Sequence, residues 1–153
     1  MEPITIREAT LSDLDMLLTF EQGVIAAERP FDPTIKEGKV HYYDIEAMIH
    51  EPHILIVVAE AGGKLIGSGY ARIEDAKPFL KHAQHAYLGF MYVVPEFRGK
   101  GVNSLIVGNL VEWARKRGIR EVILDVYDNN GPAVRAYEKA GFIPHLLQMR
   151  MPI

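Results

Sequence analysis

The chain has 153 residues, with 48% apolar and 24% charged side chains, which is the composition of one ordinary globular domain. Its lack of cysteine excludes disulfides, thiolate nucleophiles and cysteine-ligated zinc, and its net charge of −3 gives no reason to expect nucleic acid as a partner. Its apolar runs are too short to cross a bilayer, and its first residues do not resemble a signal peptide. We therefore predict a single domain over residues 1–153, located in the cytoplasm and without a membrane partner.

The N-terminal segment predicts a strand followed by a helix. Apolar and polar residues alternate over 4–7, as in a half-buried strand. A helix that Thr10 or Ser12 can cap is expected to run to about residue 27, because apolar residues recur there at helical spacing. Two prolines in 29–33 must end it, since proline removes a backbone donor and restricts the residue before it.

The middle of the chain predicts a short helix and a hairpin. The helix is expected over 41–50, and strands are expected over 54–60 and 64–73, joined by a turn at Gly62-Gly63. Residues 75–83 are polar and are predicted to form a loop.

A central strand follows this loop. Residues 87–94 are apolar almost throughout, which is typical of a strand that is buried on both faces, and Pro95 ends it. Gly67 and Gly69 in the neighbouring hairpin strand indicate a bulge or a close approach of another backbone.

The last third alternates helix and strand. We predict a helix over 102–117, a strand over 122–127, a helix over 132–140 and a final strand over 142–151. The whole order gives a mixed α/β fold with helices packed around one sheet.

Charge is distributed unevenly along the chain. Residues 1–52 hold 11 acidic and 4 basic residues, whereas residues 53–153 hold 9 acidic and 13 basic residues. This division favours a cationic ligand near the first part and an anionic ligand near the second, although a solvated surface can carry the same imbalance.

The segment 93–103 carries the strongest chemical signal. A buried strand ends at a proline, passes through the basic, glycine-rich turn Arg98-Gly99-Lys100-Gly101 and opens a long helix. Backbone N–H groups at a helix N-terminus, with cations beside them, can bind a diphosphate. The spacing fits neither the P-loop nor the dinucleotide-binding fingerprint. A turn that needs glycine only for its geometry is the alternative.

Two motifs resemble those of the GNAT acetyltransferase superfamily. Arg98-Gly99-Lys100-Gly101-Val102-Asn103 is similar to its phosphate loop, and the segment from Asn130 to Phe142 is similar to its second signature. Asn103 stands where the superfamily usually has Gly or Ala, and its side chain can cap the helix or donate its amide to a phosphate. The resemblance implies one mostly antiparallel, mixed sheet that is splayed at the cofactor site and flanked by helices.

The resemblance also implies acetyl-CoA as co-substrate. Its pantetheine arm would pair with the backbone of the central strand, and its diphosphate would lie on the glycine-rich turn. Tyr137 would lie near the sulfur and protonate the departing thiolate, or else it packs in the core beside Phe142. The residues implied in cofactor binding are Val93, Val94, Arg98, Gly99, Lys100, Gly101, Val102, Asn103, Ser104, Asn130 and Ala133.

The general base is left open between several groups. His85 or Tyr87 on the central strand could relay the proton, as could a water chain, and packing or solvent contact is the alternative for both side chains. Glu28 and Asp32 are further candidates, because the segment that holds them lines the acceptor cleft in the superfamily. His82 and His85 have the spacing of a metal pair but no third ligand nearby, so no metal is predicted.

The predicted reaction is direct transfer of an acetyl group to a primary amine. A small cationic amine is favoured, attracted by acids of the N-terminal third such as Glu21, Glu28 and Asp32. The alternatives are a protein N-terminal or lysine acetyltransferase, an acyl-CoA-binding module without turnover, and a partner-binding regulatory domain. The resemblance also allows a homodimer.

Overall fold

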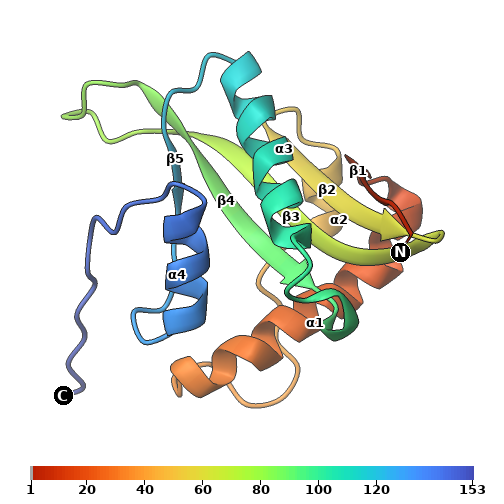
Figure 1. Cartoon of the computed structure of the whole chain (residues 1–153). Helices are drawn as coiled ribbons and strands as arrows, with labels where there is room; N and C mark the ends of the chain where they lie inside the picture. Colours follow the sequence, from red (N-terminus) through yellow and green to blue (C-terminus); the bar gives the residue numbers. More distant parts are fainter. Residues whose placement is uncertain (1) are drawn as a thin grey trace.

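The structure, a computed structural model, describes residues 2–153 and contains one five-stranded mixed sheet (Figure 1). The strands lie in chain order across the sheet, and only the β4–β5 pair is parallel. The mixed α/β fold predicted from the sequence is therefore confirmed. The strands are β1 (Ile4–Glu8), β2 (Ile54–Ala61), β3 (Lys64–Asp75), β4 (Gln84–Val93) and β5 (Val122–Leu124).

Helices cover both faces of this sheet. The helix α3 packs on one face, α1 and α2 pack on the other, and α4 lies beside β5 (Figure 1). A single 3-10 turn, Arg29–Phe31, follows α1 where the prolines were expected to end it. The helices are α1 (Leu14–Glu28), α2 (Ile45–Ile49), α3 (Val102–Lys116) and α4 (Gly131–Lys139). Within residues 2–153, no helix has both the length and the apolar character needed to cross a bilayer.

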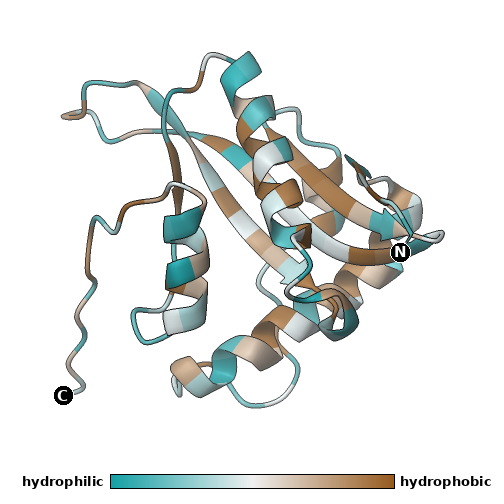
Figure 2. Cartoon of the chain, in the orientation of Figure 1, coloured by the Kyte–Doolittle hydropathy of each residue, from teal (hydrophilic) through white to brown (hydrophobic). Residues whose placement is uncertain are grey.

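The strand period of two divides the core into two layers. On β2, Ile56 and Val58 pack toward α1 and α2, whereas Val57 and Ala59 pack toward α3. Accordingly, β2 is coloured as hydrophobic along most of its length (Figure 2). Burial on both faces fixes the register, because a slip of one residue would exchange the two layers.

The parallel pair β4–β5 is short. It joins Ala86–Leu88 to Val122–Leu124. Beyond these pairs β4 continues to Val93, whereas the segment that follows β5 turns away. The strand predicted over 122–127 is therefore correct in place but too long at its C-terminal end. The two strands diverge beyond this point, as the resemblance implied.

A bulge in β4 lies next to the point of divergence. The β3–β4 register shifts between Ser68 and Tyr70, and Phe90 adopts a left-handed backbone conformation with φ of 58°. The buried Ser68 hydroxyl donates to the Phe90 carbonyl at 3.0 Å and holds the bulge. Gly69 lies opposite, where a Cβ would come within 2.6 Å of Ile106 on α3. At Gly67 a Cβ would come within 2.7 Å of the backbone oxygen of Tyr92. The bulge and the close approach of another backbone that the strand glycines predict are thus both present.

The final strand predicted over 142–151 is wrong. Residues 143–153 form no regular element, and Ile143, Leu146 and Met149 are 84%, 88% and 85% exposed. Period-two patterning predicts a strand only where a partner edge is available to accept its hydrogen bonds. Within residues 2–153, no strand pairs with the outer edge of β5, and prolines at 144 and 152 remove two donors from the segment.

The hydroxyl that holds the bulge gives a test of this architecture. Ser68→Ala leaves the buried Phe90 carbonyl without that donor, so we expect a loss of about 1–3 kcal/mol in the free energy of unfolding. Urea denaturation measures it. Thr19→Ala is the matched control, because the Thr19 hydroxyl also donates to a backbone carbonyl but is exposed, where water replaces it. Equal effects of the two substitutions would contradict the role given to Ser68.

Candidate active site

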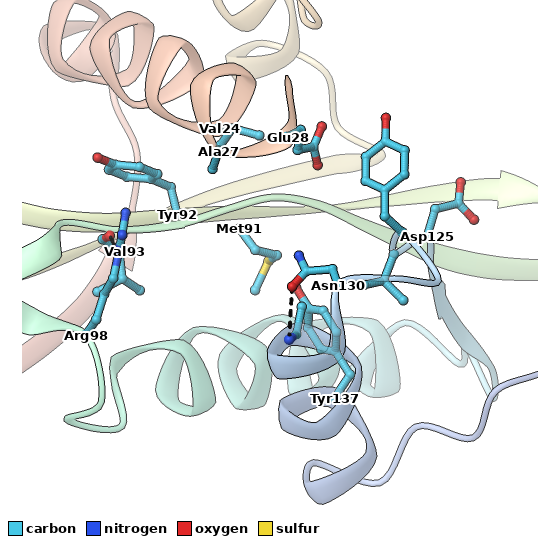
Figure 3. Close-up of a pocket in the computed structure, with 13 residues that line it drawn as sticks. Val24, Ala27, Glu28, Met91, Tyr92, Val93, Arg98, Asp125, Asn130 and Tyr137 are labelled. Carbon is cyan, nitrogen blue, oxygen red and sulfur yellow. Dashed lines mark hydrogen bonds between the residues drawn. The ribbon is translucent and has the colours of Figure 1, made fainter. Parts of the chain in front are cut away.

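A cavity of about 240 Å³ lies where β4 and β5 diverge. Four parts of the chain contribute to its wall: the end of α1, the end of β4, the segment after β5, and α4 (Figure 3). Because ligands of sheets with parallel strands bind beyond the carboxyl ends of those strands, this is the expected place for a site. The lining residues are Val24, Ala27, Glu28, Met91, Tyr92, Val93, Arg98, Asp125, Val126, Tyr127, Asn130, Ala133 and Tyr137.

The cavity is electrically polar along its length. Arg98 lies at one end beside Val93, and Glu28 and Asp125 lie toward the other end, with Asn130 between them (Figure 3). A ligand with an anionic part and a cationic part would therefore be oriented by charge alone.

The cationic end adjoins the glycine-rich turn. Arg98 donates through Nε to the Val93 carbonyl at 2.9 Å, which fixes the arginine against the end of β4. Gly99 and Gly101 have φ of 75° and 82°, a left-handed conformation that glycine adopts without strain. Gly101 is the N-cap of α3, so the first N–H groups of that helix, from Val102 to Ser104, have no intrahelical acceptor and can bind an anion.

The edge of β4 that faces the cavity carries free backbone groups. The Val94 N–H donates to the Ile66 carbonyl at 2.9 Å, toward β3. Because successive residues of a strand direct their hydrogen-bonding groups to opposite edges, the N–H of Val93 points toward the side that β5 has left. Of the two residues expected to pair with the pantetheine arm, Val93 therefore has its N–H on the cavity side, whereas that of Val94 is already used.

Asn130 and Tyr137 lie together on α4 (Figure 3). Asn130 is the N-cap, and its Oδ1 accepts from the Ala133 N–H at 3.4 Å, which leaves the amide NH₂ to donate into the cavity. Burial, with a smaller contribution from the charge of Glu28, raises the pKa of Tyr137 above its usual value, so its hydroxyl stays protonated at neutral pH. The Tyr137 ring also meets Phe142 edge to face at 5.8 Å, so the packing predicted as an alternative is present in the same side chain.

Glu28 is half-buried at the anionic end. Burial raises the pKa of its carboxyl, the nearby Tyr42 hydroxyl opposes this rise, and the charge of Asp32 adds to it. A carboxylate with a raised pKa is closer to the proton affinity that general base catalysis needs.

Asp32 does not line the cavity, although it lies near it. Its carboxylate accepts from Thr34, from Arg150 at 3.1 Å and from Tyr127 at 3.0 Å. These bonds hold the pKa of Asp32 well below its ordinary value, with the bonds to Thr34 as the largest cause. Burial and the bond to Asp32 raise the pKa of Tyr127 to about 12. The structure therefore engages Asp32 in fixing Tyr127, which does line the cavity.

His85 and Tyr87 lie outside the cavity wall. His85 Nε2 is 2.8 Å from a carboxylate oxygen of Glu74, on the neighbouring strand. The Tyr87 hydroxyl donates to Asp125 at 3.1 Å, so Tyr87 is connected to the cavity through that carboxylate. Burial, reinforced by Asp125, raises the pKa of Tyr87 and keeps it protonated.

No metal centre is built from the groups that the structure describes. The rings of His82 and His85 are 6.5 Å apart, and each faces its own carboxylate, Glu121 and Glu74 respectively. Over residues 2–153, no group of three or more His, Asp or Glu is arranged to hold a metal ion.

The sequence reasoning missed Asp125 and Tyr127. Both lie inside the strand that the sequence predicts over 122–127, where alternate residues are usually packed, so the pattern does not indicate them as site residues. The available signal was an acid directly after the apolar run at 122–124, because the carboxyl end of a strand parallel to the central one is a common position for site residues.

Comparison with known proteins identifies the family. The model of the Acetyltransferase (GNAT) family matches residues 22–142. The chain is 30% identical over 139 residues to the uncharacterized N-acetyltransferase MJ1207 of Methanocaldococcus jannaschii, which covers 90% of this chain and 60% of that relative. The chain therefore belongs to the GNAT acetyltransferase family, and the resemblance carried by its two motifs is confirmed.

Solved structures show the same fold. A mutant of the BH1408 protein from Bacillus halodurans superposes with a TM-score of 0.88 at 20% identity, covering 97% of this chain and 99% of that one. A predicted acetyltransferase from Clostridium acetobutylicum, solved with acetyl-CoA, superposes with a TM-score of 0.75 at 21% identity, covering 98% and 96%.

The burial of Glu28 gives a pH-dependent prediction. Its folded pKa is raised, so the fold favours the protonated form and loses stability from this group as the pH rises through the unfolded and then the folded pKa. Glutamine resembles the protonated form. We therefore expect Glu28→Gln to melt at a higher temperature than the parent at pH 7, and this difference to shrink toward about pH 4, near the ordinary glutamate pKa of about 4.3.

Glu138→Gln, on the exposed face of α4, is the matched control and should show no such trend. A lower melting temperature for Glu28→Gln at pH 7 would mean that the partners of the ionised carboxylate outweigh its burial.

Proposed function

We propose that this chain transfers the acetyl group of acetyl-CoA to a primary amine, with a small cationic amine as the favoured acceptor. The observation that carries the proposal is the polarity of the cavity, which runs from Arg98 and the open edge of β4 to the carboxylates of Glu28 and Asp125. Membership of the acetyltransferase family supports the reaction class.

The cationic end fits the CoA part of the co-substrate. Its diphosphate would lie on the N–H groups at the start of α3, between Arg98 and Lys100. Its arm carries amide groups that match the free N–H of Val93 and the amide of Asn130. Asn103, at the usual Gly or Ala position, is half-buried in the first turn of α3, where its amide can donate to a phosphate.

The anionic end fits the amine and its proton. An amine attacks only when neutral, so the Glu28 carboxylate would attract the ammonium ion and take one proton. The new bond joins the amine nitrogen to the acetyl carbon, while the N–H of Val93 stabilises the oxyanion that forms. The carbon–sulfur bond then breaks, and Tyr137 gives its proton to the departing thiolate. The nitrogen, now bonded to the acetyl carbon, loses its second proton as the amide forms, and this proton restores the Tyr137 hydroxyl.

Neither His85 nor Tyr87 is assigned a direct contact with the amine in this mechanism. His85 faces Glu74 outside the cavity wall, and Tyr87 acts only through Asp125. Asp32 is likewise satisfied by Thr34, Arg150 and Tyr127, so its proposed part is to hold Tyr127 rather than to bind the amine.

The direct test is thiol release from acetyl-CoA across a panel of cationic, neutral and anionic amines. We expect cationic amines to be best, and Tyr137→Phe to lower kcat about 100-fold or more with little change in CoA affinity, the scale of a lost general acid. An acceptor panel led by anionic amines would overturn the proposed acceptor class. CoA binding without thiol release on any amine would instead favour a binding module.

Asn130 separates cofactor binding from helix capping. Asn130→Asp keeps an oxygen for the cap of α4 but removes the amide donors, so CoA affinity should fall about tenfold while the melting temperature stays near that of the parent. Asn130→Ala removes both functions, so it should lose the same affinity and also about 1 kcal/mol of stability. Calorimetric titration and thermal melts measure the two effects. Normal CoA affinity of Asn130→Asp would place the arm elsewhere.

A further inference from the structure

Glu21 is a carboxylate in the core of the protein. It lies on the apolar stripe of α1, beside Leu17 and Ile25 one turn away on either side, and it is 0% exposed. A buried carboxylate is costly unless polar groups surround it, so its presence on this face requires a compensating set of donors.

Those donors come from one short segment far along the chain. Oε2 of Glu21 accepts from the backbone N–H of Tyr42 at 2.7 Å and from that of Tyr43 at 2.8 Å. Oε1 lies 2.8 Å from Nδ1 of His41. The carboxylate thus fixes three consecutive residues, 41–43, against the middle of α1.

The two tyrosines that it fixes point to different places. Tyr43 packs against Tyr70 and Phe90, with ring centres 5.5 and 5.1 Å apart, next to the bulge of β4. Tyr42 is directed to the end of α1, where its hydroxyl lies near enough to the carboxylate of Glu28 to lower the pKa of that group. Glu21 and Glu28 are seven residues apart on one helix, so the segment 41–43 bridges two turns of α1.

We propose that Glu21 is a positioning residue for the acceptor end of the active site: its carboxylate holds the segment 41–43 by three hydrogen bonds, so that the Tyr42 side chain stays beside Glu28. This inference rests on the proposed function of Glu28 as the group that binds and deprotonates the amine. Three hydrogen bonds to one buried carboxylate give the segment a single conformation, which a neutral or exposed side chain would not impose.

The contact has a consequence for the charge of Glu28. The Tyr42 hydroxyl lowers the pKa of Glu28 against the effect of burial. If the segment loosens, that pKa rises, a smaller fraction of Glu28 is ionised at a given pH, and the acidic limb of the kcat/KM profile moves to higher pH. Besides Tyr42, the titratable groups that face Glu28 from the surrounding elements are Asp32, Tyr43, Asp125, Tyr127 and Tyr137.

The experiment compares the pH profiles of four variants of the full chain. Glu21→Gln keeps the shape but removes the charge, so we expect the acidic limb to move to higher pH and KM for the amine to rise about tenfold, with CoA affinity unchanged. Tyr42→Phe should move the limb in the same direction without disturbing the core. Asp44→Ala removes the cap of α2, directly after the segment, so it should lower the melting temperature and leave the limb in place.

Glu28→Gln separates failure of this inference from failure of the proposed function. If Glu28→Gln removes the acidic limb while Glu21→Gln behaves as Asp44→Ala does, Glu21 is only structural and the inference is wrong. If the limb survives in Glu28→Gln, the proposed role of Glu28 itself fails. Should Glu21→Gln not fold, Glu21→Asp, which keeps the charge but shortens its reach by one carbon, carries the same test with the same two outcomes.

Discussion

The site exists because the pairing between β4 and β5 stops after a few residues. Among the described residues, 2–153, three residue pairs join these parallel strands, and beyond Leu88 no strand lies beside the outer edge of β4. Unpaired backbone groups in a cavity wall are costly unless something satisfies them, so this edge requires a partner. Arg98 supplies one by donating to the Val93 carbonyl, and the remaining groups are left for a ligand. The binding surface is thus a part of the sheet that the fold does not complete.

Two features at the centre of the sheet, a bulge in β4 and the close packing of α3, determine where the sheet opens. The bulge at Phe90 turns the end of β4 away from its regular course, because an extra residue on one strand bends that strand and increases its twist. The Ser68 hydroxyl secures the bulge from within, and Gly69 lets α3 pack closely against the same part of the sheet. As α3 begins at Val102, its close docking also brings its N-terminus beside the end of β4. The core therefore sets the position of the glycine-rich turn relative to the open edge.

The sequence predicts a site residue when that residue belongs to a continuous motif, and it does not when only the fold brings the residue to the site. Arg98, Asn130 and Tyr137 belong to two continuous motifs, and the fold brings all three to one cavity as expected. Asp125 reaches that cavity only because two strands diverge, and no local pattern reports this. The same holds for the segment 142–151. Its alternation of apolar and polar residues is typical of a strand, but no strand forms, because pairing depends on a neighbouring strand about which the local pattern carries no information.

The charge of the N-terminal third shows the same difference between sequence and structure. Its excess of acids predicts a field that attracts cations, yet several of these acids are neutralised within the fold. Asp13 pairs with Arg7 at 2.8 Å, Glu21 is enclosed by backbone donors, and Asp32 is held by Arg150. The negative end of the cavity is made instead by Glu28, which keeps a raised pKa, and by Asp125, which comes from the basic part of the chain. Attraction of a cation into the cavity then depends on two carboxylates that line it rather than on the charge of a segment, because exposed charges farther than about 8 Å away are screened at physiological salt.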